Sequence, residues 1–379
     1  MNAVHRNTPI DHAEPTPGSE FVGVRIDTDR RRGRGAETNR SGRFEKLEKA
    51  FVDDGWGTLD LLPPLKTEVQ IEQPKKIITR NESPDISFDR SINPYRGCEH
   101  GCVYCFARPT HAYMGLSPGL DFETRLFAKP NAAKLLEKEL ARPGYEVRTM
   151  AIGTNTDPYQ PIEKRFRIMR EILEVLDRVG HPVGIVTKSA LVLRDLDILT
   201  RMAERNLVKV ALSVTTLDRR LARAMEPRAA SPQRRLETLK LLSAAGVPTT
   251  VMVAPIVPAL NESEIERILE AGKAAGVESA GYVLLRLPLE VRDIFKEFLE
   301  REYPDRAKHV LSVLRTMRGG KDYDATWGKR MTGEGPYAWQ IGRRFEIAAR
   351  RLGLNGERRQ LRTDLFVAPT AEGAQLSLF

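Results

Sequence analysis

The three cysteines of this 379-residue chain stand close together, as Cys98, Cys102 and Cys105, and no other cysteine occurs. This arrangement excludes a disulfide framework that could join distant parts of the chain. Thiolates this close together are typical ligands of a metal ion or of an iron–sulfur cluster. Because closed sites usually have four protein ligands, three thiolates leave one coordination position free for chemistry. Gly97 and Gly101 let the backbone curve closely around a bulky inorganic group.

Two other interpretations of the cysteine loop stay open. A structural zinc ion could take His100 or His111 as its fourth ligand, although His100 lies between the cysteines and would reach the same ion only with strain. The three thiols could also be unrelated buried side chains, but their confinement to eight residues disfavours this.

The spacing C-x3-C-x2-C, with the aromatic Tyr104 just before the third cysteine, resembles the signature of the radical S-adenosylmethionine (radical SAM) superfamily. The resemblance implies a [4Fe–4S] cluster on Cys98, Cys102 and Cys105, whose fourth iron binds the amino and carboxylate groups of S-adenosylmethionine (SAM). It also implies that the reduced cluster cleaves SAM to a 5′-deoxyadenosyl radical, which takes a hydrogen atom from the substrate. Tyr104 is expected near the adenine.

Three further segments resemble the spore photoproduct lyase and DNA-repair-photolyase-like branch of this superfamily: Thr156–Glu163, Thr187–Ser189 and Leu212–Val214. By this resemblance the SAM contacts would be Thr156, Lys188 and Ser213. A lysine can neutralise a carboxylate, and hydroxyls can bond a carboxylate or a ribose. The alternatives are a turn cap for Thr156 and solvent exposure for Lys188.

Other features near these segments complete the expected site. The common Gly-Gly-Glu of the superfamily is absent, and Gly-Thr-Asn-Thr occupies residues 153–156. Glu226 and the backbone of 253–255 could also face the pocket. Spore photoproduct lyases use a further cysteine to return a hydrogen atom, which this chain lacks, so repair by that route is not expected. The candidate tyrosine donors are Tyr95, Tyr159 and Tyr282, while the catalytic residues stay unknown.

Strand and helix patterns alternate through the middle of the chain. We expect a first strand before Cys98 and five more near residues 148–152, 183–186, 208–214, 247–254 and 280–285. Amphipathic helices are expected between them, including one capped by Asn261. This order predicts an α/β fold with a parallel sheet. Six units would form the incomplete (β/α)6 TIM-like barrel that the resemblance implies, with ligands at the carboxyl ends of the strands.

The domain organisation follows from composition. We expect a disordered basic tail over 1–45, a lead-in over 46–84, the radical SAM partial barrel over 85–300, a basic helical extension over 301–355 and a flexible tail over 356–379. The chain ends Gln375-Leu376-Ser377-Leu378-Phe379. This pentapeptide resembles the motif by which bacterial polymerases and repair proteins bind the replication sliding clamp. The alternative is that it folds back on the barrel.

The charge is unevenly distributed. Residues 306–362 hold 14 Lys and Arg against 5 Asp and Glu, which alone equals the formal net charge of +9. Such a stretch fits an anionic partner, above all nucleic acid, or an Arg-rich solvated surface. The N-terminus has no apolar run, so neither a signal peptide nor a membrane anchor is expected, and the chain should be cytoplasmic.

These observations give three hypotheses from different classes. The leading one is a radical SAM [4Fe–4S] enzyme, lyase-like, that acts on nucleic acid or on a nucleotide-containing substrate and needs an unidentified electron donor. The second is a radical SAM enzyme for a small molecule or a peptide. The third is a non-catalytic nucleic-acid-binding protein with a structural metal site.

Overall fold

A computed structural model describes residues 21–22, 26, 30–45, 51–52, 64–356 and 359–369. Residues 21–22 and 51–52 are described only as the short paired strands β1 (Phe21–Val22) and β2 (Phe51–Val52). The terminal pentapeptide and most of the first 29 residues therefore lie outside the described residues.

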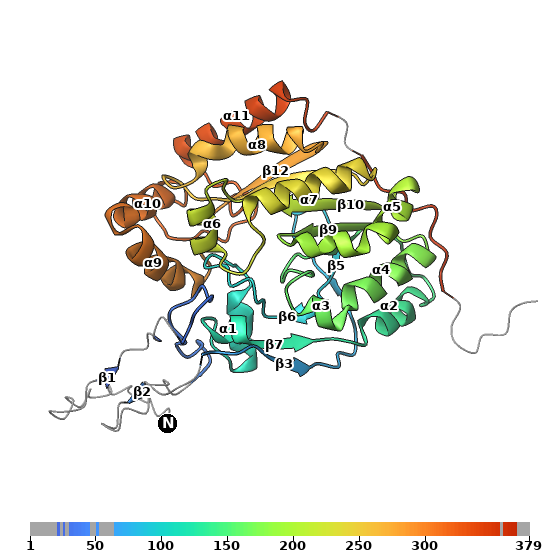
Figure 1. The fold of residues 1–379 in the computed structure, drawn as a ribbon, viewed down its shortest axis with the longest axis horizontal. Coiled ribbons are helices and arrows are strands. Elements are labelled where there is room, and N and C mark those ends of the chain that lie inside the picture. Colours follow the sequence, from blue (N-terminus) through green and yellow to red (C-terminus); the bar gives the residue numbers. More distant parts are fainter. Residues whose placement is uncertain are drawn as a thin grey trace, which may run out of the picture.

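The largest sheet in the described part of the chain holds six parallel strands in chain order (Figure 1). An antiparallel strand, β4 (Ile78–Arg80), extends its first edge. This arrangement confirms the predicted incomplete (β/α)6 barrel. The parallel strands are β5 (Arg90–Ile92), β8 (Met150–Ile152), β9 (Val183–Thr187), β10 (Val208–Ser213), β11 (Thr249–Ile256) and β12 (Ser279–Leu284).

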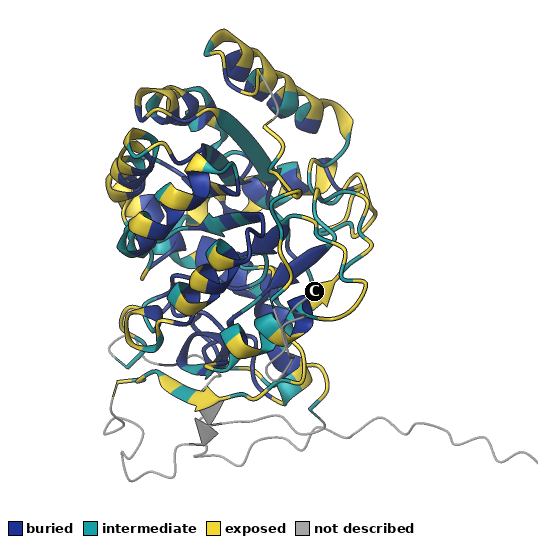
Figure 2. Cartoon of the chain, turned by 90° about the vertical axis from the view of Figure 1, so that its right-hand side faces the viewer, coloured by how far each residue is buried: buried dark blue, intermediate teal, exposed yellow. Residues whose placement is uncertain are grey.

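Amphipathic helices cover the outer face of this sheet and leave their polar sides in solvent (Figure 2). In α4 (Ile168–Arg178), for example, apolar side chains three and four positions apart are buried while Arg170 and Glu174 face outward. The covering helices are α2 (Ala132–Leu140), α4, α5 (Leu196–Glu204), α7 (Pro232–Ala244) and α8 (Ile265–Ala274).

Shorter elements connect these units. A second sheet runs β3-β7-β6, with β3 (Glu68–Ile71) parallel and β6 (Tyr95–Arg96) antiparallel to β7 (Arg125–Ala128). The short helices are α1 (Asp121–Thr124), α3 (Glu163–Phe166) and α6 (Arg219–Met225), and 3-10 turns span Arg108–Met114, Ala190–Asp195 and Glu262–Glu264.

One local prediction needs correction, and one expected helix is divided. Arg167 adopts a left-handed φ of 55° and separates α3 from α4, so the amphipathic segment after β8 forms two helices. Asn261 does not cap a helix with its side chain. Its amide instead donates to the carbonyls of Thr215 and Pro255, and its carbonyl accepts from the Val257 amide, so it ties β11 to the loop after β10.

The expected helical extension consists of α9 (Val291–Glu302), α10 (Pro304–Thr316) and α11 (Gly335–Arg351). Helix α11 lies along α8 and buries Ile341, Phe345 and Ala348 (Figure 1). Two of its four basic side chains are ion-paired to acids of the barrel: Arg344 lies 2.7 Å from Glu266, and Arg351 lies 2.6 Å from Glu270.

Residues 30–45, here called the N-terminal strap, differ from the expected disordered tail. Arg34, Glu37 and Thr38 of the strap are buried, and its backbone bonds to the main body, with the Leu120 amide donating to the Thr38 carbonyl over 3.2 Å. The strap is polar, so its sequence lacks the apolar pattern from which packing is usually predicted.

Residues 359–369 likewise pack on the barrel, within the stretch expected to be a flexible tail. The Val367 amide donates to the Val179 carbonyl, and the Arg362 amide to the Asn206 carbonyl. Phe366 rests on Tyr145 and His181, with ring centroids 5.5 Å away from each. This segment crosses the end of the barrel opposite the carboxyl ends of the strands.

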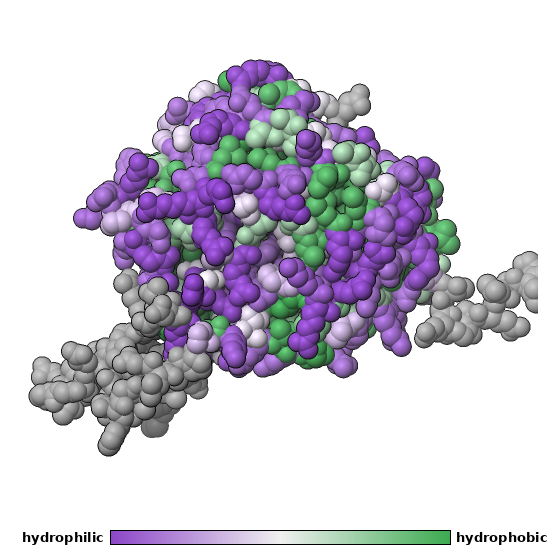
Figure 3. Space-filling view, in the orientation of Figure 1, coloured by the Kyte–Doolittle hydropathy of each residue, from purple (hydrophilic) through white to green (hydrophobic). Residues whose placement is uncertain are grey.

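The face in Figure 3 is mainly hydrophilic, with apolar side chains in small separate areas. Within the described residues, no helix has the length and apolar character needed to cross a bilayer.

Candidate active site

The three cysteines line one cavity of about 110 Å³ at the carboxyl ends of the strands. Cys98 and Cys102 are buried, Cys105 is partly exposed, and all three thiols are free. Thr156, from the loop after β8, lines the same cavity, together with Lys188 and Ser213 at the ends of β9 and β10. The structure thus brings together all seven cluster and SAM residues expected from the sequence, because Tyr104 also lines this cavity.

The cysteine loop is held by close backbone packing. Gly97 and Gly101 have φ of 72° and 65°, a region that favours glycine. A Cβ on Gly101 would lie 2.6 Å from Glu123 Oε2, and one on Gly97 would lie 2.5 Å from Leu126 Cδ2. No larger residue could replace either glycine without displacing the loop.

A buried arginine and a buried carboxylate support the loop from behind. The Arg108 guanidinium donates to the carbonyls of Cys102, Pro118 and Gly119, and forms a 2.5 Å ion pair with Glu123. Glu123 also accepts from the amide of Gly35 in the N-terminal strap over 2.8 Å. Sequence reasoning missed Arg108 and Glu123, since no local signal marks contacts between distant residues.

The donors fit an iron–sulfur cluster better than a single metal ion. Among the described residues, no three His, Cys, Asp or Glu side chains are grouped to hold one ion. His111, the better zinc candidate, is buried beside Phe122 with Nε2 3.0 Å from the Arg125 carbonyl, and it does not line the cysteine cavity. The zinc alternative therefore gains no fourth ligand from His111.

Burial sets the protonation of the free thiols. It raises the pKa of Cys98 well above its ordinary value, and that of Cys102 as well, with Glu226 adding to the effect at Cys102. Two such thiols at the cavity wall would be protonated at neutral pH. A cationic iron core would stabilise the thiolates that this environment otherwise disfavours.

Asp157 organises the strand ends beside the cysteines. Its carboxylate accepts from the Thr187 hydroxyl and the Lys188 amide, both at 2.7 Å, and lies 3.4 Å from His100 Nδ1. Burial alone would raise the pKa of Asp157, but His100, Thr187 and the Lys188 amide hold it at about 2. The carboxylate therefore stays charged and fixes the backbone from which Lys188 projects.

Lys188 reaches over the aromatic residue of the cysteine loop, with Nζ 5.8 Å from the centroid of the Tyr104 ring. Thr156 is buried, and its hydroxyl donates to the Tyr95 carbonyl over 3.1 Å. This hydrogen bond also joins the loop after β8 to β6. Ser213 is buried at the cavity wall, and its carbonyl accepts from Arg235 over 2.9 Å.

Glu226 holds Tyr104 in place through the Tyr104 hydroxyl. It accepts short hydrogen bonds from the Tyr104 hydroxyl and from Arg235, and a 2.7 Å bond from Thr215. Burial alone would raise the pKa of Glu226, but Arg235 and Lys188 hold it at about 2. Glu226 was a weaker candidate for facing the pocket, and it acts instead as the buried support of Tyr104. Arg235 was not expected at all.

The three tyrosines suggested as hydrogen donors do not line the cavity as the structure describes it. Tyr95 donates a short hydrogen bond to Glu163, Tyr159 donates to Asp195 over 3.1 Å, and Tyr282 packs against Phe345. Sequence position at a strand end does not specify side-chain direction, and the tyrosine donor stays a prediction.

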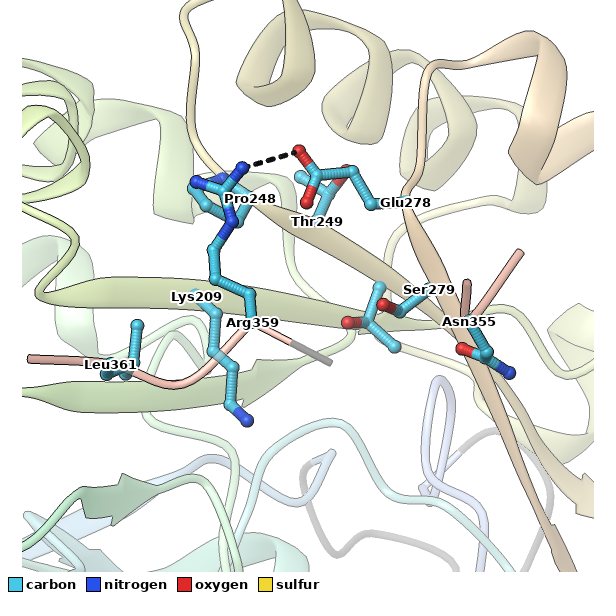
Figure 4. Close-up of a pocket in the computed structure, with 9 residues that line it drawn as sticks. Lys209, Pro248, Thr249, Glu278, Ser279, Asn355, Arg359 and Leu361 are labelled. Carbon is cyan, nitrogen blue, oxygen red and sulfur yellow. Dashed lines mark ion pairs between the residues drawn. The ribbon is translucent and has the colours of Figure 1, made fainter. Parts of the chain in front are cut away.

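A second cavity, of about 290 Å³, lies at the amino ends of β10, β11 and β12 (Figure 4). Arg359 from the C-terminal segment closes it with an ion pair 3.6 Å from Glu278. In barrels of this kind the amino end serves stability, whereas ligands bind at the carboxyl end. The cysteine cavity is therefore the candidate active site.

Comparison with known proteins decides the family. The model of the radical SAM superfamily matches residues 92–272, which include the cysteine loop and the ends of β8, β9 and β10. The chain belongs to the radical SAM superfamily. Enzymes of this superfamily bind a [4Fe–4S] cluster and SAM, so the chain is a radical SAM enzyme that cleaves SAM with an iron–sulfur cluster.

Two curated proteins and one solved structure are similar to this chain. Uncharacterized protein Rv2578c of Mycobacterium tuberculosis (strain ATCC 25618 / H37Rv) is 40% identical over 232 residues, 61% of this chain and 68% of that protein. Uncharacterized protein MJ0683 of Methanocaldococcus jannaschii is 28% identical over 240 residues, 63% of this chain and 85% of that protein. Spore photoproduct lyase complexed with dinucleoside spore photoproduct has the same fold, with a TM-score of 0.54 and 17% identity over 76% of this chain and 80% of that one.

Proposed function

We propose that Cys98, Cys102 and Cys105 hold three irons of the cluster and leave the fourth iron to SAM. The observation that carries this proposal is the shared cavity: three thiols and the SAM-contact candidates Thr156, Lys188 and Ser213 line one small space. When bound and reduced, the cluster supplies the electron that cleaves SAM to a 5′-deoxyadenosyl radical.

The side chains around the cavity have separate roles in this proposal. Lys188 supplies positive charge for the SAM carboxylate, and the Ser213 hydroxyl supplies a hydrogen bond. Tyr104 offers its ring to the adenine, and the bond to Glu226 holds that ring in place. Asp157 orients Lys188 by fixing its backbone amide. Thr156 offers its hydroxyl oxygen as an acceptor while its O–H donates to the Tyr95 carbonyl.

For the substrate, we propose nucleic acid or a nucleotide-containing molecule. The fold is that of an enzyme solved with a dinucleoside lesion, and a second such structure holds AdoMet as well, with a TM-score of 0.52 and 16% identity. The segments at the ends of β8, β9 and β10, which resemble the spore photoproduct lyase branch in sequence, also support this substrate class. The absence of a fourth cysteine from the sequence argues for a reaction other than that of spore photoproduct lyase.

The positive charge of the helical extension supports a nucleic-acid substrate less strongly than its composition implied. Besides the pairs from α11 to α8, Arg330 forms a 2.6 Å ion pair with Asp85, and Arg315 one with Asp322. Arginines that neutralise carboxylates of the same chain have less charge available for a phosphate backbone. This pairing favours the second candidate function, a radical SAM enzyme for a small molecule or a peptide.

One anaerobic assay tests the enzyme proposal. Reconstituted protein with dithionite and SAM should form 5′-deoxyadenosine, and the Cys102→Ala variant should form none and bind less iron. The matched control is Ser243→Ala, whose hydroxyl lies 2.7 Å from the Thr249 hydroxyl, at the amino end of β11 and far from the cysteine loop. Wild-type protein that holds one zinc ion and no iron, or Cys102→Ala protein that cleaves SAM normally, would refute the proposed ligand set.

A further inference from the structure

A cation without a counter-ion lies at the mouth of the cysteine cavity. Arg286 follows the end of β12, on the same edge of the sheet as Lys188 and Ser213. Among the described residues it forms no ion pair with a carboxylate, and its buried Nε has no hydrogen-bond partner. Its other contacts are long: 3.4 Å to the Tyr323 hydroxyl and 3.5 Å to Met331 Sδ. The side chain is half-buried, and a buried N–H without an acceptor, such as this Nε, is costly unless a ligand accepts from it.

Other arginines near Arg286 do have a carboxylate partner. Arg292, six residues along the chain, pairs with Asp293 at 2.9 Å, and Arg330 pairs with Asp85. Arg318 is the exception. It is buried close to Arg286, donates only to the carbonyls of Leu285 and Lys329, and also leaves its Nε without a partner. Among the described residues, neither of these two neighbouring guanidinium groups has a carboxylate within ion-pair distance, although Asp324 acts on Arg318 from further away.

Aromatic side chains lie at the same place. The Arg286 guanidinium is 4.9 Å from the centroid of the Phe106 ring, and Phe106 directly follows Cys105 and lines the cysteine cavity. The Phe106 side chain is 43% exposed, although its neighbours in the loop are mostly buried. An exposed ring beside a cation is the pairing with which proteins bind nucleotides: the base stacks on the ring and the phosphate bonds the guanidinium.

We propose that Phe106 and Arg286 form the substrate subsite, in which a nucleotide unit of a single-stranded nucleic acid stacks its base on Phe106 and places its phosphate on Arg286. This inference rests on the proposed nucleic-acid substrate and assigns its position: the base lies next to the cavity that holds the cluster. Tyr323, whose hydroxyl faces Arg286, borders the subsite on its outer side.

The test is binding of two labelled twelve-residue oligonucleotides to the reconstituted protein at low salt, one of thymidines and one of the same length with abasic sites. Arg286→Met should weaken binding of both by about tenfold, because it removes a charged phosphate contact. Arg286→Lys should lose less, since it keeps the charge but not the planar fork. Phe106→Leu should weaken binding of the thymidine oligonucleotide by about tenfold and leave the abasic one nearly unchanged.

Controls separate a lost contact from a lost fold. Arg292→Met removes a nearby arginine that is already paired, and should bind like the wild type. Phe106→Tyr keeps the ring and should also bind like the wild type, and iron content should be normal in every variant compared. Wild-type affinity in Arg286→Met protein with normal iron would overturn this subsite and leave the proposed function standing. A wild-type protein that binds neither oligonucleotide would overturn both the subsite and the proposed nucleic-acid substrate.

Discussion

At the scale of single residues, the site depends on carboxylates that are kept charged inside the protein. Glu226 is buried, yet Arg235 and Lys188 keep its pKa near 2, and it holds the Tyr104 hydroxyl. Asp157 is kept charged in a similar way and fixes the Lys188 backbone. Neither carboxylate is expected to contact SAM. In the proposed arrangement, each instead positions a side chain that contacts SAM, Tyr104 for Glu226 and Lys188 for Asp157.

Removing the charge of Glu226 should therefore cost stability. Glu226→Gln leaves Arg235 buried without its ionic partner, so we expect a loss of about 3 kcal/mol in the free energy of unfolding, measured with urea. The folded pKa of about 2 lies below the ordinary value of 4.5, so this contribution is complete above pH 4.5 and is lost as the pH falls towards 2. The difference between wild type and variant should shrink over that interval.

The exposed pair Arg234–Glu237 supplies the control, because Glu237→Gln should change stability by less than about 1 kcal/mol. Equal stability of Glu226→Gln and wild type at neutral pH would contradict the supporting role of Glu226.

The grouping of the cysteines with the proposed SAM contacts in one cavity was predictable from the sequence, and the residues that support them were not. Cysteine spacing is a local signal, and the carboxyl ends of parallel strands meet at one edge, which is why Lys188 and Ser213 reach the cysteine cavity. Arg235 and Glu123 act through partners 9 to 88 residues away, and no local pattern announces such contacts.

At the scale of elements, the five later strands lie close to their expected positions because most are short apolar runs bounded by turn residues. The first, β5, was expected only as a strand before Cys98, because its sequence Arg-Ser-Ile is not an apolar run. The N-terminal strap was missed for the opposite reason. It is fixed by hydrogen bonds and close backbone contacts, such as Gly35 and Ala36 donating to Glu123, and not by apolar side chains. Its Arg and Gly content is the composition of a disordered segment.

The strap should be required for a stable cysteine loop. A Cβ on Gly35 would lie 1.8 Å from the Gly101 carbonyl oxygen, so Gly35→Ala must push the strap away from the loop. We expect this variant to retain less iron after reconstitution, measured as iron per chain, and to lose iron faster to a chelator. Gly356→Ala, where a Cβ would meet no atom within 4 Å, is the control. Normal iron retention in Gly35→Ala would show that the strap is dispensable for the loop.

At the scale of the whole molecule, the candidate active site lies at one end of the barrel, and the C-terminal segment packs on the other end. The cysteine cavity lies at the carboxyl ends of the strands, whereas residues 359–369 cross the amino ends. Several basic side chains of residues 306–362 are paired with carboxylates, of the barrel for Arg344 and Arg351 and of the extension itself for Arg315. Composition alone could not predict this, because pairing depends on which helices pack together.

The terminal residues Gln375, Leu376, Leu378 and Phe379 lie outside the described residues, and their binding to a sliding clamp stays a proposal. Deleting Gln375–Phe379 should abolish capture of the protein on immobilised clamp and leave SAM cleavage unchanged. Equal capture of the full-length and the shortened protein would rule out this motif as the clamp-binding segment.

The central claim is that the three cysteines bind three irons of the cluster and that SAM binds the fourth iron. Electron–nuclear double resonance of the reduced protein, with SAM labelled by ¹⁷O in its carboxylate and ¹⁵N in its amino group, tests it most directly. We expect hyperfine coupling from both labelled positions, and its loss when unlabelled SAM is used. A cluster that shows no coupling to either label, or coupling to a nitrogen of the protein at the fourth iron, would contradict the account.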